Sequence, residues 1–113
     1  MKRPDILRRK EDFSDLFRKG KSAGSRYVVV IYLKNGLDFN RKAFLASKKV
    51  GNSVLRNRAR RLMKEAYRQT EATLPQGYDI LMIARNTITE AKCQDVLTSL
   101  NNAFARAGIK DRK

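Results

Sequence analysis

The apolar positions of this 113-residue chain follow helix-like spacing in some segments and strand-like spacing in others. A first helix is predicted at residues 11–19. Three apolar side chains recur there at the three- and four-residue spacing of one helix face: Phe13, Leu16 and Phe17. Gly20 is predicted to end this helix in a left-handed conformation, which costs glycine little. The N-terminal part of the chain therefore offers a short helix whose apolar face carries two phenylalanines.

Strand-like blocks follow this helix. Residues 27–33 are a continuous run of β-branched and aromatic side chains, which is typical of a strand covered on both faces. The pair Asn35-Gly36 signals a turn, after which residues 43–47 predict a second strand. Residues 78–84 predict a third.

Two longer helices complete the pattern. Asn52 or Ser53 is predicted to cap a helix that runs to about Thr70. The spacing of Thr87 and Glu90 is that of a capping box and predicts the start of a last helix. Its apolar stripe consists of Ile88, Ala91, Val96, Leu97, Leu100, Ala103, Phe104 and Ala107. The order α-β-β-α-β-α predicts one small α+β domain over the whole chain, with helices packed on a central sheet.

Charge is the unusual feature of the composition. Lys and Arg number 26 against 11 Asp and Glu, a formal net charge of +15. Residues 41–68 hold ten basic residues and one acidic residue, whereas residues 69–113 hold six and five. Such a localised excess indicates a polyanionic partner, above all a nucleic acid. Residues 1–10 and 109–113 are expected to be flexible basic ends, because few apolar side chains anchor them.

The composition also excludes several chemistries. Without a histidine, the chain has no histidine base, no His-ligated metal and no Ser-His-Asp triad. A single cysteine, Cys93, excludes an intramolecular disulfide and a cysteine zinc site, and a packed thiol is the expected role. No apolar run is long enough for a membrane span, and the basic N-terminus lacks the apolar segment of a secretory signal. We therefore expect a cytoplasmic protein with no membrane partner and no metal site of its own.

The predicted middle helix has one apolar and one cationic face. Its apolar positions fall within an arc of about 100°: Leu55, Ala59, Leu62, Met63 and Ala66. The other face carries Arg56, Arg58, Arg60, Arg61, Lys64 and Arg68, interrupted only by Glu65. An ordinary solvated face mixes both signs, and cations in the first turns oppose the helix dipole. Anion binding, with phosphate as the natural ligand, is therefore favoured over simple solvation.

The same region carries a recognisable motif. Residues 48–61 read Lys-Lys-Val-Gly-Asn-Ser-Val-Leu-Arg-Asn-Arg-Ala-Arg-Arg. This stretch resembles the signature of the protein subunit of bacterial ribonuclease P, an Arg-Asn-Arg helix preceded by a Ser-Lys-Lys-x-Gly-Asn loop. Residues 11–20 and 79–85 resemble the N-terminal helix and the last strand of that family. The resemblance thus extends over nearly the whole chain.

The resemblance implies a fold and a function. The family's fold contains a left-handed β-α-β crossover, whereas the general chirality rule favours a right-handed one. The enzyme is a ribonucleoprotein whose RNA removes the 5′ leader of precursor tRNA with Mg²⁺. The protein has no catalytic residues; it binds the RNA and the single-stranded leader. Mg²⁺ would then be held mainly by the RNA and not by the isolated chain. The chain would have the ribonuclease P RNA and precursor tRNA as partners, and no obligate protein partner.

By position, the resemblance also assigns roles to residues. Contacts to the RNA subunit are expected from Lys49, Arg58, Arg60, Arg61, Lys64 and Arg68. A leader-binding cleft is expected from Phe13, Phe17, Ile31, Lys48, Arg56, Asn57 and Arg85. Aromatic rings beside cations suit single-stranded RNA, although the two phenylalanines also fit a purely structural role in the core. A structural ribosomal RNA-binding protein and a DNA-binding protein with an arginine helix in the major groove are the alternative functions.

Overall fold

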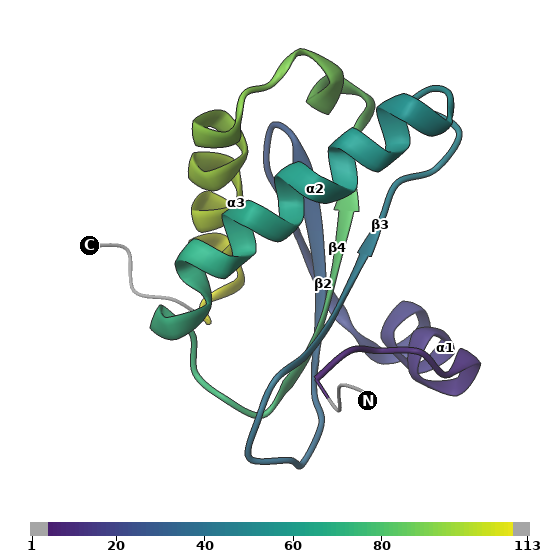
Figure 1. The fold of residues 1–113 in the computed structure, drawn as a ribbon. Coiled ribbons are helices and arrows are strands. Elements are labelled where there is room, and N and C mark those ends of the chain that lie inside the picture. Colours follow the sequence, from purple (N-terminus) through teal and green to yellow (C-terminus); the bar gives the residue numbers. More distant parts are fainter. Residues whose placement is uncertain (1–4, 110–113) are drawn as a thin grey trace.

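The computed structural model describes residues 5–109, which form a four-stranded sheet with helices on both faces (Figure 1). The elements in chain order are α1 (Lys10–Lys19), β1 (Lys21–Gly24), β2 (Val28–Lys34), β3 (Arg41–Leu45), α2 (Ser53–Thr70), the 3-10 helix η1 (Glu71–Thr73), β4 (Tyr78–Ala84), the 3-10 helix η2 (Asn86–Glu90) and α3 (Cys93–Ala107). Within this range, no helix combines the length and the apolar character that a bilayer crossing requires.

The sheet has the order β1-β2-β4-β3. β2 is antiparallel to both β1 and β4, whereas β3 is parallel to β4, so α2 must carry the chain back between β3 and β4. Figure 1 views the sheet from the α2 side, with β3 and β4 pointing upward and β4 to the left of β3. The β3–α2–β4 crossover is therefore left-handed. Both the α+β class and this exception to the general chirality rule are confirmed.

The main core lies between the sheet and the layer formed by α2 and α3. Its largest fully buried side chains include Tyr67, Phe104, Met63, Ile80, Met82, Ile88 and Leu100. The ring of Tyr67 packs edge-on against Phe44 and Phe104, with centroid distances of 5.9 and 6.4 Å. Burial holds the pKa of the Tyr67 phenol well above its usual range. The predicted apolar faces of both long helices thus form the core.

A second, smaller cluster lies on the opposite face of the sheet, under α1. Leu16 is fully buried there, together with Leu7, Ala43 and Leu81. Ile31 and Leu33 of β2 pack against this cluster, while Val28 and Val30 belong to the main core. The alternation along β2 confirms that this strand is covered on both faces.

One strand was missed from the sequence, and two local predictions were wrong. The strand β1 was not predicted, because Lys21–Gly24 has no apolar alternation and is held by its backbone pairing with β2. The segment with capping-box spacing forms η2, and α3 begins only at Cys93, where the Asp95 carboxylate accepts a hydrogen bond from the Lys92 N–H at 2.9 Å. Gly20 has φ −69°, so it is not a left-handed cap; a Cβ there would collide with the Leu16 carbonyl oxygen and lie 2.9 Å from Ile31 Cγ2.

The ends of the described chain pack against the fold. Lys42 donates its N–H to the Asp5 carbonyl and accepts from the Leu7 N–H, both at 2.8 Å, so residues 5–7 lie along the edge of β3. Leu7 and Ile109 are buried. Apolar anchors therefore exist inside both segments expected to be flexible, whereas residues 1–4 and 110–113 lie outside the described residues.

Candidate nucleic-acid interface

The start of α2 depends on a glycine and an asparagine. Gly51 has φ +143°, and a Cβ on it would lie 2.5 Å from Leu55 Cδ1, so a side chain does not fit. Asn52 caps the helix as predicted: its side-chain oxygen accepts from the Leu55 N–H at 3.0 Å. The first turn contains no acidic residue. The positive end of the helix dipole is therefore not offset by carboxylates of its own first turn.

The cations of α2 differ in how firmly they are held. Arg61, Lys64 and Arg68 are exposed. Arg60 is half-buried and donates to Asn57 Oδ1 at 2.5 Å, which orients its guanidinium along the helix. Arg68 donates to both Glu65 carboxylate oxygens, at 2.7 and 3.1 Å, and this contact lowers the pKa of the Glu65 carboxyl.

The two arginines nearest the helix start are partly tied to the protein itself. Arg56 is half-buried and donates to Ser53 Oγ at 3.2 Å. Arg58 reaches across to the chain after β4, where its Nη2 donates to the Ala91 carbonyl at 2.8 Å. Arg58, predicted as an RNA contact, therefore also connects α2 to the segment between η2 and α3.

A pocket of about 560 Å³ lies between α1, the edge of β3 and α2. Phe13, half-buried, lines it on the α1 side, and Arg60, Lys64 and Arg68 line it from α2. One residue predicted for the leader, Phe13, thus lines the same concave surface as three residues predicted for the RNA subunit. Phe13 therefore combines a place in the second cluster with an accessible position beside three cations.

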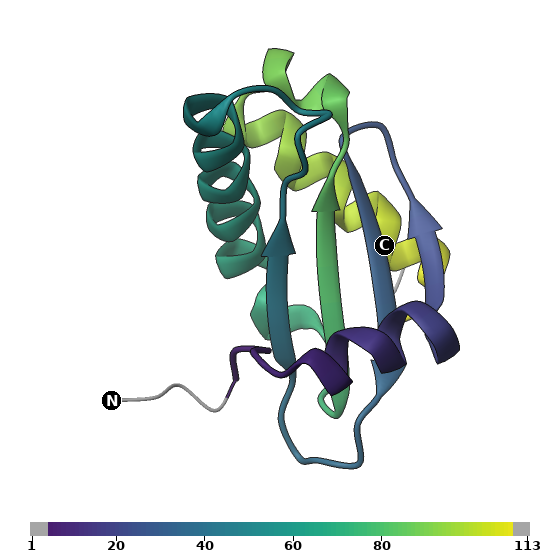
Figure 2. The same ribbon diagram turned by 90° about the vertical axis from the view of Figure 1, so that its right-hand side faces the viewer.

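The sheet face on the α1 side is only half covered. Figure 2 shows α1 crossing the sheet near the starts of β3 and β4, with no helix over the other half of this face. The apolar side chains there are partly exposed: Val29 and Ile83 are half-buried, and Leu45 is 39% exposed. Phe17 on α1 is 58% exposed, so a purely core role does not describe it. Ile31 is also half-buried, but it packs against the second cluster.

Cations lie at one end of the uncovered half of this face. β3 and β4 are parallel, so the residues that follow them lie at the same end of the sheet. Lys48 and Lys49 are exposed in the loop after β3, and Arg85, exposed directly after β4, donates to the Ser25 carbonyl at 3.0 Å. Arg56 and Asn57 follow in the first turns of α2. An apolar surface flanked by cations is suited to a single-stranded nucleic acid, whose bases have apolar faces and whose backbone is anionic.

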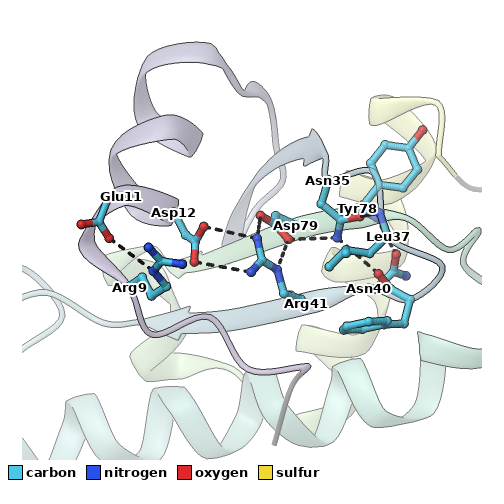
Figure 3. A network of polar contacts seen from close by, with 10 residues as sticks. Arg9, Glu11, Asp12, Asn35, Leu37, Asn40, Arg41, Tyr78 and Asp79 are labelled. Carbon is cyan, nitrogen blue, oxygen red and sulfur yellow. Dashed lines mark hydrogen bonds and ion pairs between the residues drawn. The ribbon is translucent and has the colours of Figure 1, made fainter.

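A buried ion-pair network joins α1 to this sheet (Figure 3). Arg41 on β3 donates to both carboxylate oxygens of Asp79 on β4, at 2.7 and 2.6 Å, and Asp79 is 5% exposed. The same guanidinium reaches Asp12 on α1 at 3.3 Å, while Asn35 donates to Asp79 at 3.0 Å. The hydrogen bond to Asp79 raises the pKa of the Arg41 guanidinium, against the opposing effect of burial. One arginine therefore holds three elements together.

Similarity to known proteins identifies the family of this chain. The profile of the family described as Ribonuclease P matches residues 1–108. The chain is 41% identical over 109 residues to the ribonuclease P protein component of Alkaliphilus oremlandii, covering 96% of each chain, and 40% identical to that of Pelotomaculum thermopropionicum, covering 96% and 97%. The chain belongs to the ribonuclease P protein family.

Solved structures of this family share the fold. The ribonuclease P protein of Staphylococcus aureus superposes with a TM-score of 0.85 at 27% identity, over 96% of this chain and all of that one. The protein of Thermotoga maritima superposes with a TM-score of 0.78 at 32% identity, over 86% and 92%. Membership in the ribonuclease P family favours a subunit of ribonuclease P over the two alternatives, a ribosomal RNA-binding protein and a DNA-binding protein.

Several residues of this surface were missed from the sequence. Val29, Leu45 and Ile83 were read only as strand residues, although their half-exposure makes them the floor of the open sheet face. Arg41 and Asp12 were counted only as charges. No sequence signal marked this pair, because the predicted strand begins at residue 43, whereas β3 begins at Arg41.

Proposed function

We propose that the chain acts as the accessory protein of ribonuclease P by binding both the RNA subunit and the single-stranded 5′ leader of precursor tRNA. As a member of this family, the chain is a subunit of the endoribonuclease that matures the 5′ end of tRNA. The observation that carries the finer proposal is the pairing of a cationic helix with a half-open apolar sheet face. The first suits phosphates and the second suits unpaired bases.

The RNA subunit is the partner proposed for α2. Its contacts would come from Lys49, Arg60, Arg61, Lys64 and Arg68, with Arg58 contributing charge while it braces the helix. Arginine donates in a planar fork that matches phosphate oxygens, and docked phosphates would offset the unfavourable cations at the helix start. Each phosphate contact releases counterions, so binding should weaken steeply with salt.

The leader is the partner proposed for the open sheet face. Phe13, Phe17 and Ile31 would meet its bases, and Lys48, Arg56, Asn57 and Arg85 would meet its backbone at the end of the sheet. Stacking on an aromatic ring tolerates any base, because every base has a π face. The same surface can therefore accept leaders of different sequence.

The RNA is proposed to supply the chemistry. Residues 5–109 contain no group of three Asp, Glu, Cys or His side chains placed to hold a metal ion. Catalytic Mg²⁺ would then be held mainly by the RNA, and the protein would act on affinity and not on the reacting atoms. We place this complex in the cytoplasm and expect it to need no second protein.

The test of the proposal is reconstitution with a bacterial ribonuclease P RNA. Cleavage of precursor tRNA on the 5′ side is expected to be stimulated by the protein at low Mg²⁺, because the cations of α2 offset RNA charge that Mg²⁺ otherwise screens. The control is the RNA alone at high Mg²⁺, which shows that the RNA is active. Absence of stimulation, with an active RNA and a folded protein, would overturn the proposal.

Replacing Phe17 by alanine is expected to weaken binding of precursor tRNA with a leader by roughly 5- to 100-fold, the range of one lost base stack. Binding of mature tRNA, which lacks the leader, should be unchanged, as measured with the reconstituted complex. Leu37→Ala is the matched control, because Leu37 is also a large exposed apolar residue (41%) but lies in the loop between β2 and β3. Equal losses for both tRNAs would take Phe17 out of leader binding.

A further inference from the structure

The two rings proposed for the leader are carried by a helix with few connections to the rest of the fold. α1 lies on the sheet through Leu16, which is fully buried, and through half-buried Phe13. Such apolar contacts are not directional. The backbone pairing of residues 5–7 with Lys42 and of β1 with β2 fixes where the helix begins and ends. The rotation of the helix about its axis is left to its side-chain contacts.

A single side chain of α1 supplies a directional contact. Among the α1 side chains that the structure describes, only Asp12 is hydrogen-bonded to another element. The acids Glu11 and Asp15 pair instead with Arg9 and Arg18, in or next to the same helix. Asp12 directly precedes Phe13, so a contact that fixes Asp12 also fixes the first ring and, one turn later, Phe17.

The partner of Asp12 is itself held rigidly. Arg41 is anchored by two short hydrogen bonds to Asp79, whose carboxylate also accepts from Asn35 (Figure 3). Asp79 lies in β4, the central parallel partner of β3. The guanidinium is thus a fixed donor on the sheet, offered to α1 at the distance of 3.3 Å from Asp12.

We propose that the Asp12–Arg41–Asp79 chain sets the position of α1 over the sheet so that Phe13 and Phe17 are held ready for the leader. Asp12 and Arg41 are positioning residues, since their side chains are engaged with each other and with Asp79 and are not among those proposed to contact the leader. The inference rests on the proposed leader binding at the same face. It adds that the geometry of this face is set by a buried carboxylate on β4, through one arginine.

The test uses Asp12→Ala, because the Asp12–Arg41 contact is longer than the Arg41–Asp79 contacts and its loss leaves the Arg41–Asp79 pair intact. The reconstituted complex is expected to lose roughly three- to tenfold in affinity for precursor tRNA with a leader, the range between an exposed ion pair and a charge-assisted hydrogen bond. Affinity for mature tRNA, affinity of the protein for the RNA subunit, and kcat at saturating substrate should not change. Asp12→Asn, whose amide oxygen still accepts from the guanidinium, should recover part of the loss.

The matched control is Asp15→Ala, which removes an ion-paired aspartate three residues further along the same helix, where its partner Arg18 belongs to α1 itself. It should leave all these affinities at the wild-type value. Equal losses for tRNA with and without a leader, or a loss as large in the control, would overturn the positioning role. If the wild-type complex itself shows no preference for tRNA with a leader, the proposed leader site is wrong. This outcome differs from a failure of the positioning role, in which the wild-type preference is present and Asp12→Ala does not reduce it.

A second measurement tests the position of α1 without RNA. The chain contains no tryptophan, so Phe17→Trp introduces a single indole on α1, which can be excited selectively in the presence of the four tyrosines. Adding Asp12→Ala to this variant should lower the fluorescence anisotropy of the indole, whereas adding Asp15→Ala should not. Unchanged anisotropy with Asp12→Ala would show that α1 keeps its position without the ion pair, and the inference would be wrong.

Discussion

Replacing Arg60 and Arg61 together by glutamine is expected to weaken binding of the RNA subunit by about 10- to 100-fold at low salt, as for the loss of two charge-assisted phosphate contacts. Arg61 is exposed, and Arg60 is oriented along the helix by Asn57. The slope of log affinity against log salt concentration should become shallower by about one to two units. Equilibrium binding to a labelled RNA subunit over a series of salt concentrations measures both quantities.

The control removes the same charge elsewhere. The double variant Lys34→Gln, Arg106→Gln lowers the net charge by the same amount as the Arg60 and Arg61 variant. Lys34 lies at the end of β2 and Arg106 in the last turn of α3. The salt slope of this control should stay close to the wild-type slope. An equal change in the control would mean that net charge alone attracts the RNA, and an unchanged slope for Arg60 and Arg61 would remove them from the phosphate contacts.

Replacing Arg41 by methionine is expected to lower the free energy of unfolding by about 3 kcal/mol, because it leaves a buried carboxylate without its main partner. Asp79 is 5% exposed and would keep only the hydrogen bond from Asn35. The methionine fills much of the space of the arginine stem, so the loss reports the charge and not a cavity. Urea denaturation of the free protein measures it.

The same substitution at an exposed pair provides the control. The side chains of Arg18 and Asp15 are 69% and 43% exposed. Arg18→Met removes their ion pair and should lower the free energy of unfolding by no more than about 0.5 kcal/mol. A similar small loss for Arg41→Met would show that the Asp79 carboxylate finds solvent or another donor. The network would then not be a fixed support for α1.

Most helices and strands could be predicted from residues close together in the sequence. The two faces of α2 follow from the spacing of Leu55, Ala59 and Met63 against the arginines, since helix geometry repeats every few residues. β2 follows from a dense β-branched run, and β4 from a short, mostly apolar run after a turn. β1 could not be predicted, because its residues carry no pattern and its order comes from the backbone of β2, several residues away.

The candidate site was only partly visible from the sequence, for a similar reason. The signature loop and the basic helix indicated a nucleic-acid partner by composition and motif alone. That Phe13 shares a pocket with Arg60 and Lys64, and that Arg58 binds the carbonyl of Ala91, depends on residues 33 to 51 positions apart meeting in space. Half-exposed strand residues such as Leu45 carry no sequence signal that separates a surface floor from a core.

By itself the sequence determined most of the helices and strands, where the positive charge is concentrated, and which family the signature motif resembles, because all three depend on local spacing and composition. The tertiary structure alone decided which half of the sheet stays open and how Asp12, Arg41 and Asp79 meet. These depend on strand order and helix placement, and the partners of Arg41 are 29 and 38 residues away along the chain. Charge pairing over such distances is set by the packing of whole elements, which no local pattern encodes.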